Sequence, residues 1–503
     1  MNAKLTTAKY SISTGLTELR TQELTVQEES EIREQREQNV VGLYPDFTYQ
    51  KFEGYGCAMT ETACYLLSQM KPEQRKEALS CWFGPSGVDA RFIRIPIDSC
   101  DYSLEEYQAV KDPIADPELR TFSIERDRKW ILPIVKEAMA MAGHPLSVLL
   151  SPWSPPAVWK TPPLRSSNDA AVYGGKAAEG EEGKPSRCNG GSLKPEYYGP
   201  WANYLTKYVQ AYLDEGIPVT MLSVQNEASA ATNWDSCVWT GEQERVFVRD
   251  HLYPAMKKAG LTEKVGIFVW DHNKERLVEH IEEIMKSDTA DLISGFAYHW
   301  YSGDHFEALS MLREKYPGKI LMHSESCGLH IPGKALAFDI PPEKLEELGE
   351  DHFLTKLSKM DPKEMDLKDA TDYAHDMLGD LNHGMQRWID WNMMVDRTGG
   401  PRHVPGGFAA PLVFEADGSF SRTPSYEYIK LIAKTLRPGC VRMGCSVYGR
   451  EVEACAGKNE DGTVGVMLLN RTGEDVTVNL RISGKLIEVP LIEDSFSAVL
   501  LSE

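Results

Sequence analysis

The sequence predicts an α/β protein in which a (β/α)8 TIM barrel is joined to an antiparallel β-sandwich. Three observations favour this fold. Eight short apolar runs alternate with longer amphipathic stretches, polar residues gather just past each run, and after about residue 410 the apolar pattern shortens to a period near two. At 503 residues, the chain is long enough for a large catalytic domain and a smaller second domain.

The eight apolar runs are the predicted barrel strands. Most gaps between them show helical periodicity, as in residues 199–215 and 241–259. The predicted strands cover residues 54–59, 92–97, 147–150, 219–224, 266–270, 295–299, 320–323 and 388–391. Because polar residues follow the strands, we expect them to meet at the carboxyl-terminal face, where barrel active sites are built.

The predicted sandwich follows the barrel. Turn dipeptides such as Asp461-Gly462 and Ser483-Gly484 separate short strands, and Pro490 suggests that the last of them lies at an edge. These strands cover residues 441–448, 452–456, 463–469, 476–482 and 487–492. We expect the N-terminal segment, residues 1–50, to add a strand to this sandwich. The predicted domains are therefore 1–50 as that segment, 51–410 as the catalytic barrel and 411–503 as the C-terminal sandwich.

Two long segments leave the predicted active-site face. Residues 161–199 are rich in Gly, Ser and Pro, and residues 328–371 carry an acidic helix-like piece at 341–349. Loops of this length are commonly functional or disordered, and we expect both to shape a substrate cleft.

Composition excludes several classes of function. The formal net charge of −21 disfavours nucleic acid and anionic membrane surfaces as partners. The first residues lack the apolar core of a signal peptide, and no apolar run reaches the roughly 18 residues of a membrane span, so we expect a cytoplasmic protein without integral membrane association. The ten Cys residues form no CxxC pairs and are expected to be reduced thiols. We expect no metal and no cofactor, because no ligand cluster is visible.

Two glutamates carry the chemistry. Glu227 and Glu325 each follow a short apolar run, so each carboxylate is expected at the mouth of the barrel. Two carboxylates in such a place are what glycoside hydrolysis requires, one as acid/base and one as nucleophile. Asn226, directly before Glu227, can bind a sugar hydroxyl beside the acid. Arg94 lies inside an apolar strand, so we expect it to pair with a carboxylate and orient it.

These residues lie in a series of motifs that resembles glycoside hydrolase family 30, most closely its glucosylceramidase branch. The resemblance runs from about residue 52 to residue 497, with the pieces in family order. The motifs are GYGCAMT at 54–60, IRIPIDSCDYS at 93–103, LSPWSPP at 150–156, Asn226-Glu227, WTGEQE at 239–244, AYHWY at 297–301, SESC at 324–327, DWN at 390–392 and LLNRT at 468–472. One departure is Ala228, where the family usually has Pro after the acid/base glutamate.

The resemblance implies roles for individual residues. Glu227 would be the acid/base, Glu325 the nucleophile, Asp101 a sugar-binding carboxylate and Trp153 a platform for the sugar ring. Trp391 offers a second flat apolar face. We expect Asn226 to bond the 2-hydroxyl. His299 and Tyr301 could hydrogen-bond the nucleophile.

The leading hypothesis is a retaining, exo-acting β-glycosidase that hydrolyses β-glucosides, including glucosylceramide-like ones, and whose partner is a small β-glycoside or oligosaccharide. Within the family, β-xylosidase or another β-glycosidase is the alternative, because the sequence does not reveal the wall that separates glucose from xylose. Two other classes are a non-catalytic carbohydrate-binding barrel and a barrel amidase that uses Cys. The presence of both glutamates disfavours the first, and the lack of a Cys, His and Asn in a recognisable order disfavours the second.

Overall fold

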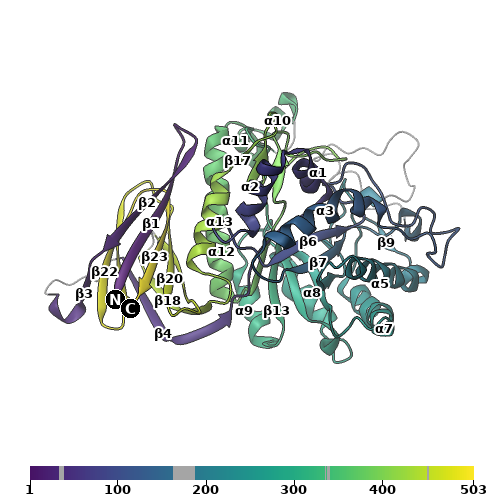
Figure 1. The fold of residues 1–503 in the computed structure, drawn as a ribbon, viewed down its shortest axis with the longest axis horizontal. Coiled ribbons are helices and arrows are strands. Elements are labelled where there is room, and N and C mark those ends of the chain that lie inside the picture. The colour runs from purple at the N-terminus through teal and green to yellow at the C-terminus, as the bar shows by residue number, and fades with distance from the viewer. Residues whose placement is uncertain (33–38, 162–186, 335, 337–339, 450–451) are drawn as a thin grey trace.

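A closed barrel of eight parallel strands forms the centre of the larger domain (Figure 1). The computed structural model describes residues 1–32, 39–161, 187–334, 336, 340–449 and 452–503. Each predicted barrel strand is found, within a few residues at its ends. The barrel strands are β5 (Gly54–Ala58), β6 (Phe92–Ile97), β7 (Ser147–Pro152), β10 (Val219–Ser223), β11 (Gly266–Asn273), β12 (Gly295–His299), β13 (Ile320–Glu325) and β14 (Arg387–Asp390). The predicted TIM barrel is therefore confirmed.

Large apolar side chains fill the barrel interior. Seven of the eight strands contribute to one buried cluster, which consists of Phe92, Leu149, Met221, Phe268, Ala297, Met322 and Ile389. Most of these residues lie near the middle or the start of their strands, so the apolar cluster leaves the carboxyl ends of the strands for polar groups. The barrel is a packed core with its chemistry confined to one end.

Helices cover the outside of the barrel, and their ends follow ordinary capping rules. The longest, α12 (Pro362–His383), has Asp361 and Glu364 in a capping box and ends at Gly384, whose φ of 117° favours glycine. The others are α1 (Glu61–Gln69), α2 (Pro72–Phe83), α3 (Glu125–Met141), α5 (Tyr198–Asp214), α6 (Gly241–Phe247), α7 (Tyr253–Lys258), α8 (Leu277–Ile284), α9 (Phe306–Lys315), α10 (Pro342–Leu348), α11 (Phe353–Ser358) and α13 (Pro424–Thr435).

The two long predicted loops have different outcomes. Residues 162–186, which make up most of the loop 161–199, lie outside the described residues. Of the segment 328–371, the acidic piece forms helix α10, which is followed by α11 and the start of α12.

A ten-stranded, largely antiparallel sheet forms the second domain (Figure 1). Its order is β2-β1-β23-β20-β19-β18-β4-β21-β22-β3, and only β4 and β21 pair in parallel. Its strands are β1 (Asn2–Ser11), β2 (Leu16–Leu24), β3 (Val26–Glu28), β4 (Val40–Lys51), β18 (Val441–Tyr448), β19 (Val452–Lys458), β20 (Val464–Asn470), β21 (Val476–Ile482), β22 (Lys485–Leu491) and β23 (Ser495–Ser502). The predicted sandwich domain is confirmed, although β23 was not anticipated.

Both chain ends meet in this sheet. β1 pairs with β23 over most of its length, from Asn2 opposite Ser502 to Ala8 opposite Phe496. The predicted boundaries at residues 50 and 410 fall next to the end of β4 and just before β16 (Leu412–Phe414). Helices α12 and α13 pack between the large sheet and the barrel and contact strands of the sheet (Figure 1).

Short strands outside the barrel and the large sheet form two smaller sheets. β15 (Met394–Asp396), β16 and β17 (Phe420–Arg422) make a three-stranded sheet, and β8 (Lys160–Thr161) pairs with β9 (Ser192–Leu193). Among the described residues, no helix combines the length and the apolar character needed to cross a bilayer. All ten Cys are free thiols, and eight of them are buried.

The close approach of β5 and β6 gives a test of the barrel packing. A Cβ on Gly56 would lie 2.5 Å from the carbonyl oxygen of Phe92, so Gly56→Ala should force the two strands apart and destabilise the protein by about 1–3 kcal/mol. Gly143→Ala is the control, because its Cβ would meet no atom within 4 Å. Urea unfolding of both variants measures the difference, and equal stabilities would contradict the described packing.

Candidate active site

A pocket of about 200 Å³ opens at the carboxyl ends of the barrel strands. Its lining combines carboxylates, amides and aromatic rings, as expected of a site that binds a polar ring with apolar faces. The lining residues are Asp101, Trp153, Asn226, Glu227, Ala230, Thr232, Trp234, His272, Asn273, Tyr301, Glu325, Cys327, Leu329, Trp391 and Phe408. Seven of the nine predicted site residues are among them.

Arg94 lies beneath the pocket and joins its polar groups. The side chain is fully buried on β6, and its guanidinium donates to Glu325 Oε2 at 2.5 Å and to Asn226 Oδ1 at 2.7 Å. It also donates to Asp271 Oδ2 at 3.0 Å and to Ser151 Oγ at 3.2 Å. A buried guanidinium is stable only when it is paired and hydrogen-bonded, and here all these groups depend on it for their position. The predicted orienting contact is thus present.

Asp271 is the second centre of this network. Its Oδ2 accepts hydrogen bonds from Arg94 and from Ser223 Oγ at 2.6 Å, and its Oδ1 accepts from Ser324 Oγ at 2.5 Å and His299 Nε2 at 3.1 Å. Burial would raise its pKa, but Arg94, His299 and Ser223 outweigh burial and hold the pKa of Asp271 well below its usual range. Asp271 is therefore a permanent negative charge in the barrel.

A bulge in β11 sends consecutive side chains in different directions. Trp270 and Asp271 have φ values of 75° and 46°, and the pairing with β12 slips between Trp270 and His272. Such left-handed backbone in non-glycine residues costs energy and is concentrated at functional sites. Through the bulge, Asp271 points into the buried network while His272 lines the pocket.

Glu325, at the end of β13, is held by two donors. Arg94 bonds one of its carboxylate oxygens, and Tyr301 Oη donates to the other at 3.1 Å. His299 Nδ1 lies 3.9 Å from Oε1. The residue is only 6% exposed, and it lines the pocket. Glu325 is thereby fixed in one orientation.

Glu227 follows β10 in a strained turn. Its φ is 51°, and its N–H donates to the carbonyl of Asp271 at 2.7 Å. Its Oε1 lies 3.5 Å from His299 Nδ1 and 3.6 Å from His272 Nδ1. One nitrogen of His299 is thus within 4 Å of both Glu227 and Glu325, so the two carboxylates face the same small space.

The charges of this cluster are interdependent. Burial raises the pKa of Glu325 and Glu227 raises it further, against the opposing effects of His299 and Arg94. Burial also acts to raise the pKa of Glu227, but His299, His272 and Arg94 outweigh it and lower that pKa. Burial would lower the pKa of His299, whereas Glu325, Asp271 and Glu227 raise it to about 9. The two glutamates therefore titrate as a pair and not independently.

Two tryptophans form one wall. Trp153 and Trp391 stack with ring centroids 5.0 Å apart and planes inclined by 24°, and the Arg94 guanidinium lies 4.9 Å from the Trp153 ring. Both rings line the pocket although almost no surface of either is exposed. This wall gives the pocket an apolar surface.

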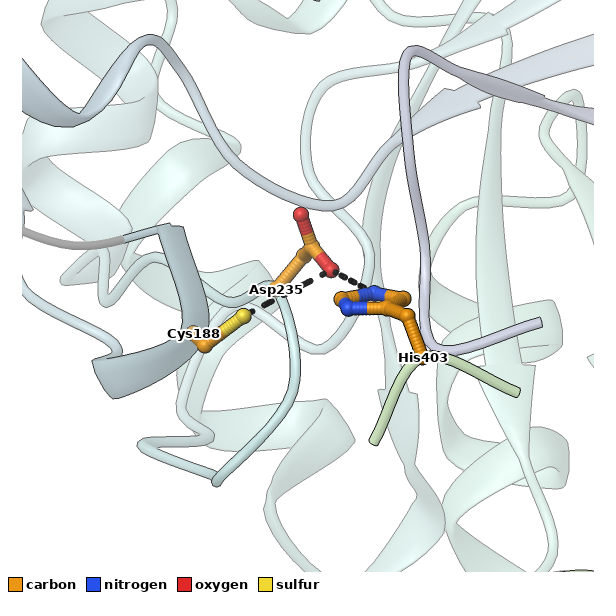
Figure 2. Close-up of side chains that lie close together, drawn as sticks. All are labelled: Cys188, Asp235 and His403. Carbon is orange, nitrogen blue, oxygen red and sulfur yellow. Dashed lines mark hydrogen bonds and ion pairs between the residues drawn. The ribbon is translucent and has the colours of Figure 1, made fainter. Parts of the chain in front are cut away.

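The loop after β15 borders the pocket. Arg402 donates to Asp101 Oδ2 at 2.7 Å, and Phe408 lines the pocket. His403 Nε2 lies 2.9 Å from Asp235 Oδ2 (Figure 2). It also lies 3.0 Å from the carbonyl of Cys100. These contacts fix residues 402–408 against the ends of β6 and of the 232–236 segment.

Three outcomes differ from the sequence-based expectations. His299 has no exposed surface and lies behind the carboxylates, not among the lining residues, so it positions them from below. His272 and Arg402 were not anticipated as site residues. His272 lies two positions past the end of the predicted strand 266–270. The bulge that turns it toward the pocket has no recognisable pattern in the sequence. Arg402 lies 12 residues past the end of β14, beyond the residues that directly follow a barrel strand.

Comparisons with known proteins agree with this geometry. The glycosyl hydrolase family 30 TIM-barrel domain matches residues 52–332 and 356–436, and the β-sandwich domain of that family matches residues 439–499. Putative glucosylceramidase 4 of Caenorhabditis elegans is 26% identical over 84% of this chain and 75% of its own length. The lysosomal acid glucosylceramidase of Mus musculus is 26% identical over 87% and 78%.

Two further matches widen the comparison. Endo-1,6-beta-D-glucanase neg1 of Aspergillus fumigatus is 22% identical over 86% of this chain and 80% of its own length. The crystal structure of SrfJ from Salmonella typhimurium superposes with a TM-score of 0.82 at 27% identity and covers both chains completely.

The Arg94–Asp271 pair predicts a large loss of stability when one charge is removed. Asp271→Asn leaves Arg94 without its main partner in a fully buried site, which should cost about 3–5 kcal/mol. Asp288→Asn is the control, because Asp288 pairs with Arg245 and Arg249 on the exposed surface and should matter little. Denaturant titration compares the two variants, and similar losses would argue against a buried network.

Proposed function

This chain belongs to glycoside hydrolase family 30, and we propose that it is a retaining, exo-acting β-glycosidase that hydrolyses β-glucosides. One observation carries the proposal: two buried carboxylates, Glu227 and Glu325, line the pocket at the barrel mouth and lie within 4 Å of the same nitrogen of His299 beneath it. Two carboxyl groups on either side of one small space are the arrangement that a double displacement requires.

In the first step, Glu325 attacks the anomeric carbon while Glu227 donates its proton to the glycosidic oxygen. The glycosidic bond breaks, the aglycone leaves as an alcohol, and the sugar remains as an ester of Glu325. The contacts support these roles: Arg94 and Tyr301 hold Glu325 as a carboxylate, whereas among the described residues no Arg or Tyr donates a hydrogen bond to Glu227, which can turn toward the leaving oxygen. Without substrate, burial raises the pKa of Glu325 and the two imidazoles lower that of Glu227, which is the reverse of what the first step needs. Substrate must therefore shift the proton to Glu227, and the donors on Glu325 favour the charge there once substrate excludes water.

In the second step, Glu227 removes a proton from water, the water oxygen attacks the anomeric carbon, and Glu325 leaves as a carboxylate. The intermediate prepares this step electrostatically. When Glu325 is esterified its negative charge is gone, so His299 and Arg94 act on Glu227 without a competing carboxylate. This favours deprotonated Glu227, which is the form that acts as base.

Several groups are placed to bind the sugar. The Asn226 carbonyl is occupied by Arg94, which directs the amide nitrogen toward the pocket as a donor to the 2-hydroxyl. Asp101 faces the pocket as an acceptor for two hydroxyls, and the Trp153–Trp391 wall offers apolar surface to the C–H face of a pyranose.

The loop beside the pocket is the basis for proposing an exo-acting enzyme. The Arg402–Asp101 ion pair and the contacts of His403 fix residues 402–408 next to the pocket, where the loop would obstruct a longer chain. Glucose is favoured over xylose because the matched relatives are named for glucosyl units, as glucosylceramidases and an endo-1,6-β-glucanase. The glucanase name supports a second candidate, internal cleavage of β-1,6-glucan.

A substrate panel separates these candidates. We expect release of glucose from p-nitrophenyl β-glucoside at a rate at least tenfold above that from the β-xyloside, with the β-anomer appearing first in the proton NMR spectrum. Mixed oligosaccharides from β-1,6-glucan would favour the endo-glucanase. Early α-glucose would contradict retention, and no turnover of any glycoside would favour a binding protein.

The roles of the two glutamates are separable by leaving group. Glu227→Gln should lose about 100-fold or more on p-nitrophenyl or alkyl glycosides and much less on dinitrophenyl glycosides, which need no proton. Glu325→Ala should lose turnover of both, and added azide should restore it with formation of a glycosyl azide of inverted anomer. Equal losses on both leaving groups in Glu227→Gln would contradict the acid role.

The raised pKa of Asp101 predicts that KM depends on pH in the acidic range. Burial raises its pKa to about 6, because the opposing effect of Arg402 is partly cancelled by Glu325 and Glu227. Below pH 6 the carboxyl gains a proton and loses acceptor capacity, so KM should rise as the pH falls. In Asp101→Asn, KM should be high at every pH and lack this dependence. A wild-type KM that is constant between pH 5 and 7 would contradict the role of Asp101.

A further inference from the structure

Three potential ligand atoms converge on one point of the pocket. Glu227 Oε1 lies 3.6 Å from His272 Nδ1 and 3.5 Å from His299 Nδ1, and all three atoms lie within 4.8 Å of one another. His272 is nine-tenths buried and His299 completely so. Neither Nδ1 atom makes a hydrogen bond, because the separations from Glu227 Oε1 are long for one. A buried polar atom without a partner requires an explanation, such as an ion.

The spacing fits a tetrahedral metal ion. Zinc binds imidazole nitrogen and carboxylate oxygen at about 2.0–2.2 Å, so neighbouring ligands in a tetrahedron lie about 3.4 Å apart. The two measured separations from Glu227 Oε1 are within a few tenths of an ångström of this value. Two His and one Glu are also a known donor set for zinc sites that keep an open position.

The surroundings of the cluster orient its ligands. His299 donates its other ring nitrogen to Asp271, which is itself fixed by Arg94, Ser223 and Ser324. Such a carboxylate behind a ligating imidazole sets the tautomer and turns the free nitrogen toward the metal. His299 Nδ1 therefore points to the cluster without any rearrangement.

Charge and access favour a divalent cation. With neutral imidazoles, Asp271, Glu227 and Glu325 carry three negative charges against one positive charge on Arg94. A divalent ion in place of the imidazolium proton would neutralise the other two. Glu227 and His272 both line the pocket, so an ion can enter from solvent and the fourth coordination position faces the cavity.

We propose that Glu227, His272 and His299 form a zinc-binding site inside the pocket, and that zinc binding and substrate binding exclude each other. An ion there occupies Glu227, which can then neither donate nor accept a proton. The inhibition therefore rests on the proposed acid/base role of Glu227, whereas the binding of the ion does not. The site would make a metal-independent hydrolase sensitive to free zinc.

A second cluster of residues that could bind a metal is compared with the first. Cys188, Asp235 and His403 lie together, and His403 belongs to the loop 402–408 beside the pocket (Figure 2). There Nε2 of His403 already bonds Asp235 and the carbonyl of Cys100, and Asp235 also accepts from Arg187 at 3.1 Å and Ser99 at 2.8 Å. Its polar atoms are engaged in hydrogen bonds and a buried ion pair, so an ion would have to break them.

Zinc binding is measured directly by competition with a chromogenic chelator, on the full chain. We expect one Zn²⁺ per chain to bind tightly enough to compete with the chelator. Saturating amounts of a glucose-shaped iminosugar should displace it. In kinetic assays, zinc should raise the apparent KM for p-nitrophenyl β-glucoside with kcat unchanged, and EDTA should reverse the effect. No bound zinc, or zinc that the iminosugar does not displace, would overturn the proposal.

Variants locate the ion. His272→Asn should weaken zinc binding at least tenfold, and Glu227→Gln, which also removes a ligand, serves the same purpose if His272→Asn does not fold. His403→Asn tests the second cluster, and His144→Asn removes a His that pairs with Asp89 at 3.1 Å near the surface; both should bind zinc as the wild type does. Loss of binding in His403→Asn alone, or unchanged binding in both pocket variants, would overturn the assignment.

The two proposals fail in different ways. A chain that binds zinc through His272 but hydrolyses no glycoside would keep the metal site and refute the proposed function. A chain that hydrolyses β-glucosides but does not bind zinc would keep the proposed function and refute the metal site.

Discussion

The arrangement of the pocket depends on one buried cation. Arg94 has no exposed surface, yet its guanidinium reaches Glu325, Asn226 and Asp271 at distances of 2.5–3.0 Å. These three groups come from three different strands or strand ends, so a single planar side chain sets their mutual spacing. A guanidinium suits this task because its five donors lie in a fixed plane, whereas the ammonium of Lys would act as a point charge.

This arrangement costs stability at the barrel mouth, as do other buried ion pairs such as that of Lys274 with Asp376 and Asp380. Desolvating a guanidinium and several carboxylates is expensive, and an all-apolar core of the same volume would be at least as stable. The apolar cluster in the rest of the barrel follows that alternative. Strained backbone at Glu227, Trp270 and Asp271 lies in the same small region as the buried charges. Charge burial and strain together mark the part of the molecule that is arranged for chemistry.

Periodicity in the sequence predicted the features that are set by residues close together along the chain. The barrel strands appear as apolar runs, and the two glutamates are visible because each follows such a run. Features that depend on contacts across the fold were not predictable in the same way. Arg402 reaches Asp101 from 301 positions away, and His272 faces the pocket only because β11 contains a bulge. The cluster proposed to bind zinc was missed for the same reason, since its three residues lie at the ends of three different strands with no characteristic spacing.

The last strand of this sequence, β23, lies inside the large sheet, third from one edge. β23 pairs with β1 on one side and β20 on the other, so neither of these strands has its full set of partners until residue 502 is available. During translation, β1 and β2 have to wait for almost the whole chain with an unpaired backbone edge, while the barrel between them and β23 can already fold. Contacts of such sequence separation form slowly and leave exposed edges prone to association. The sandwich is therefore the domain whose assembly in the cell depends most on protection of the nascent chain.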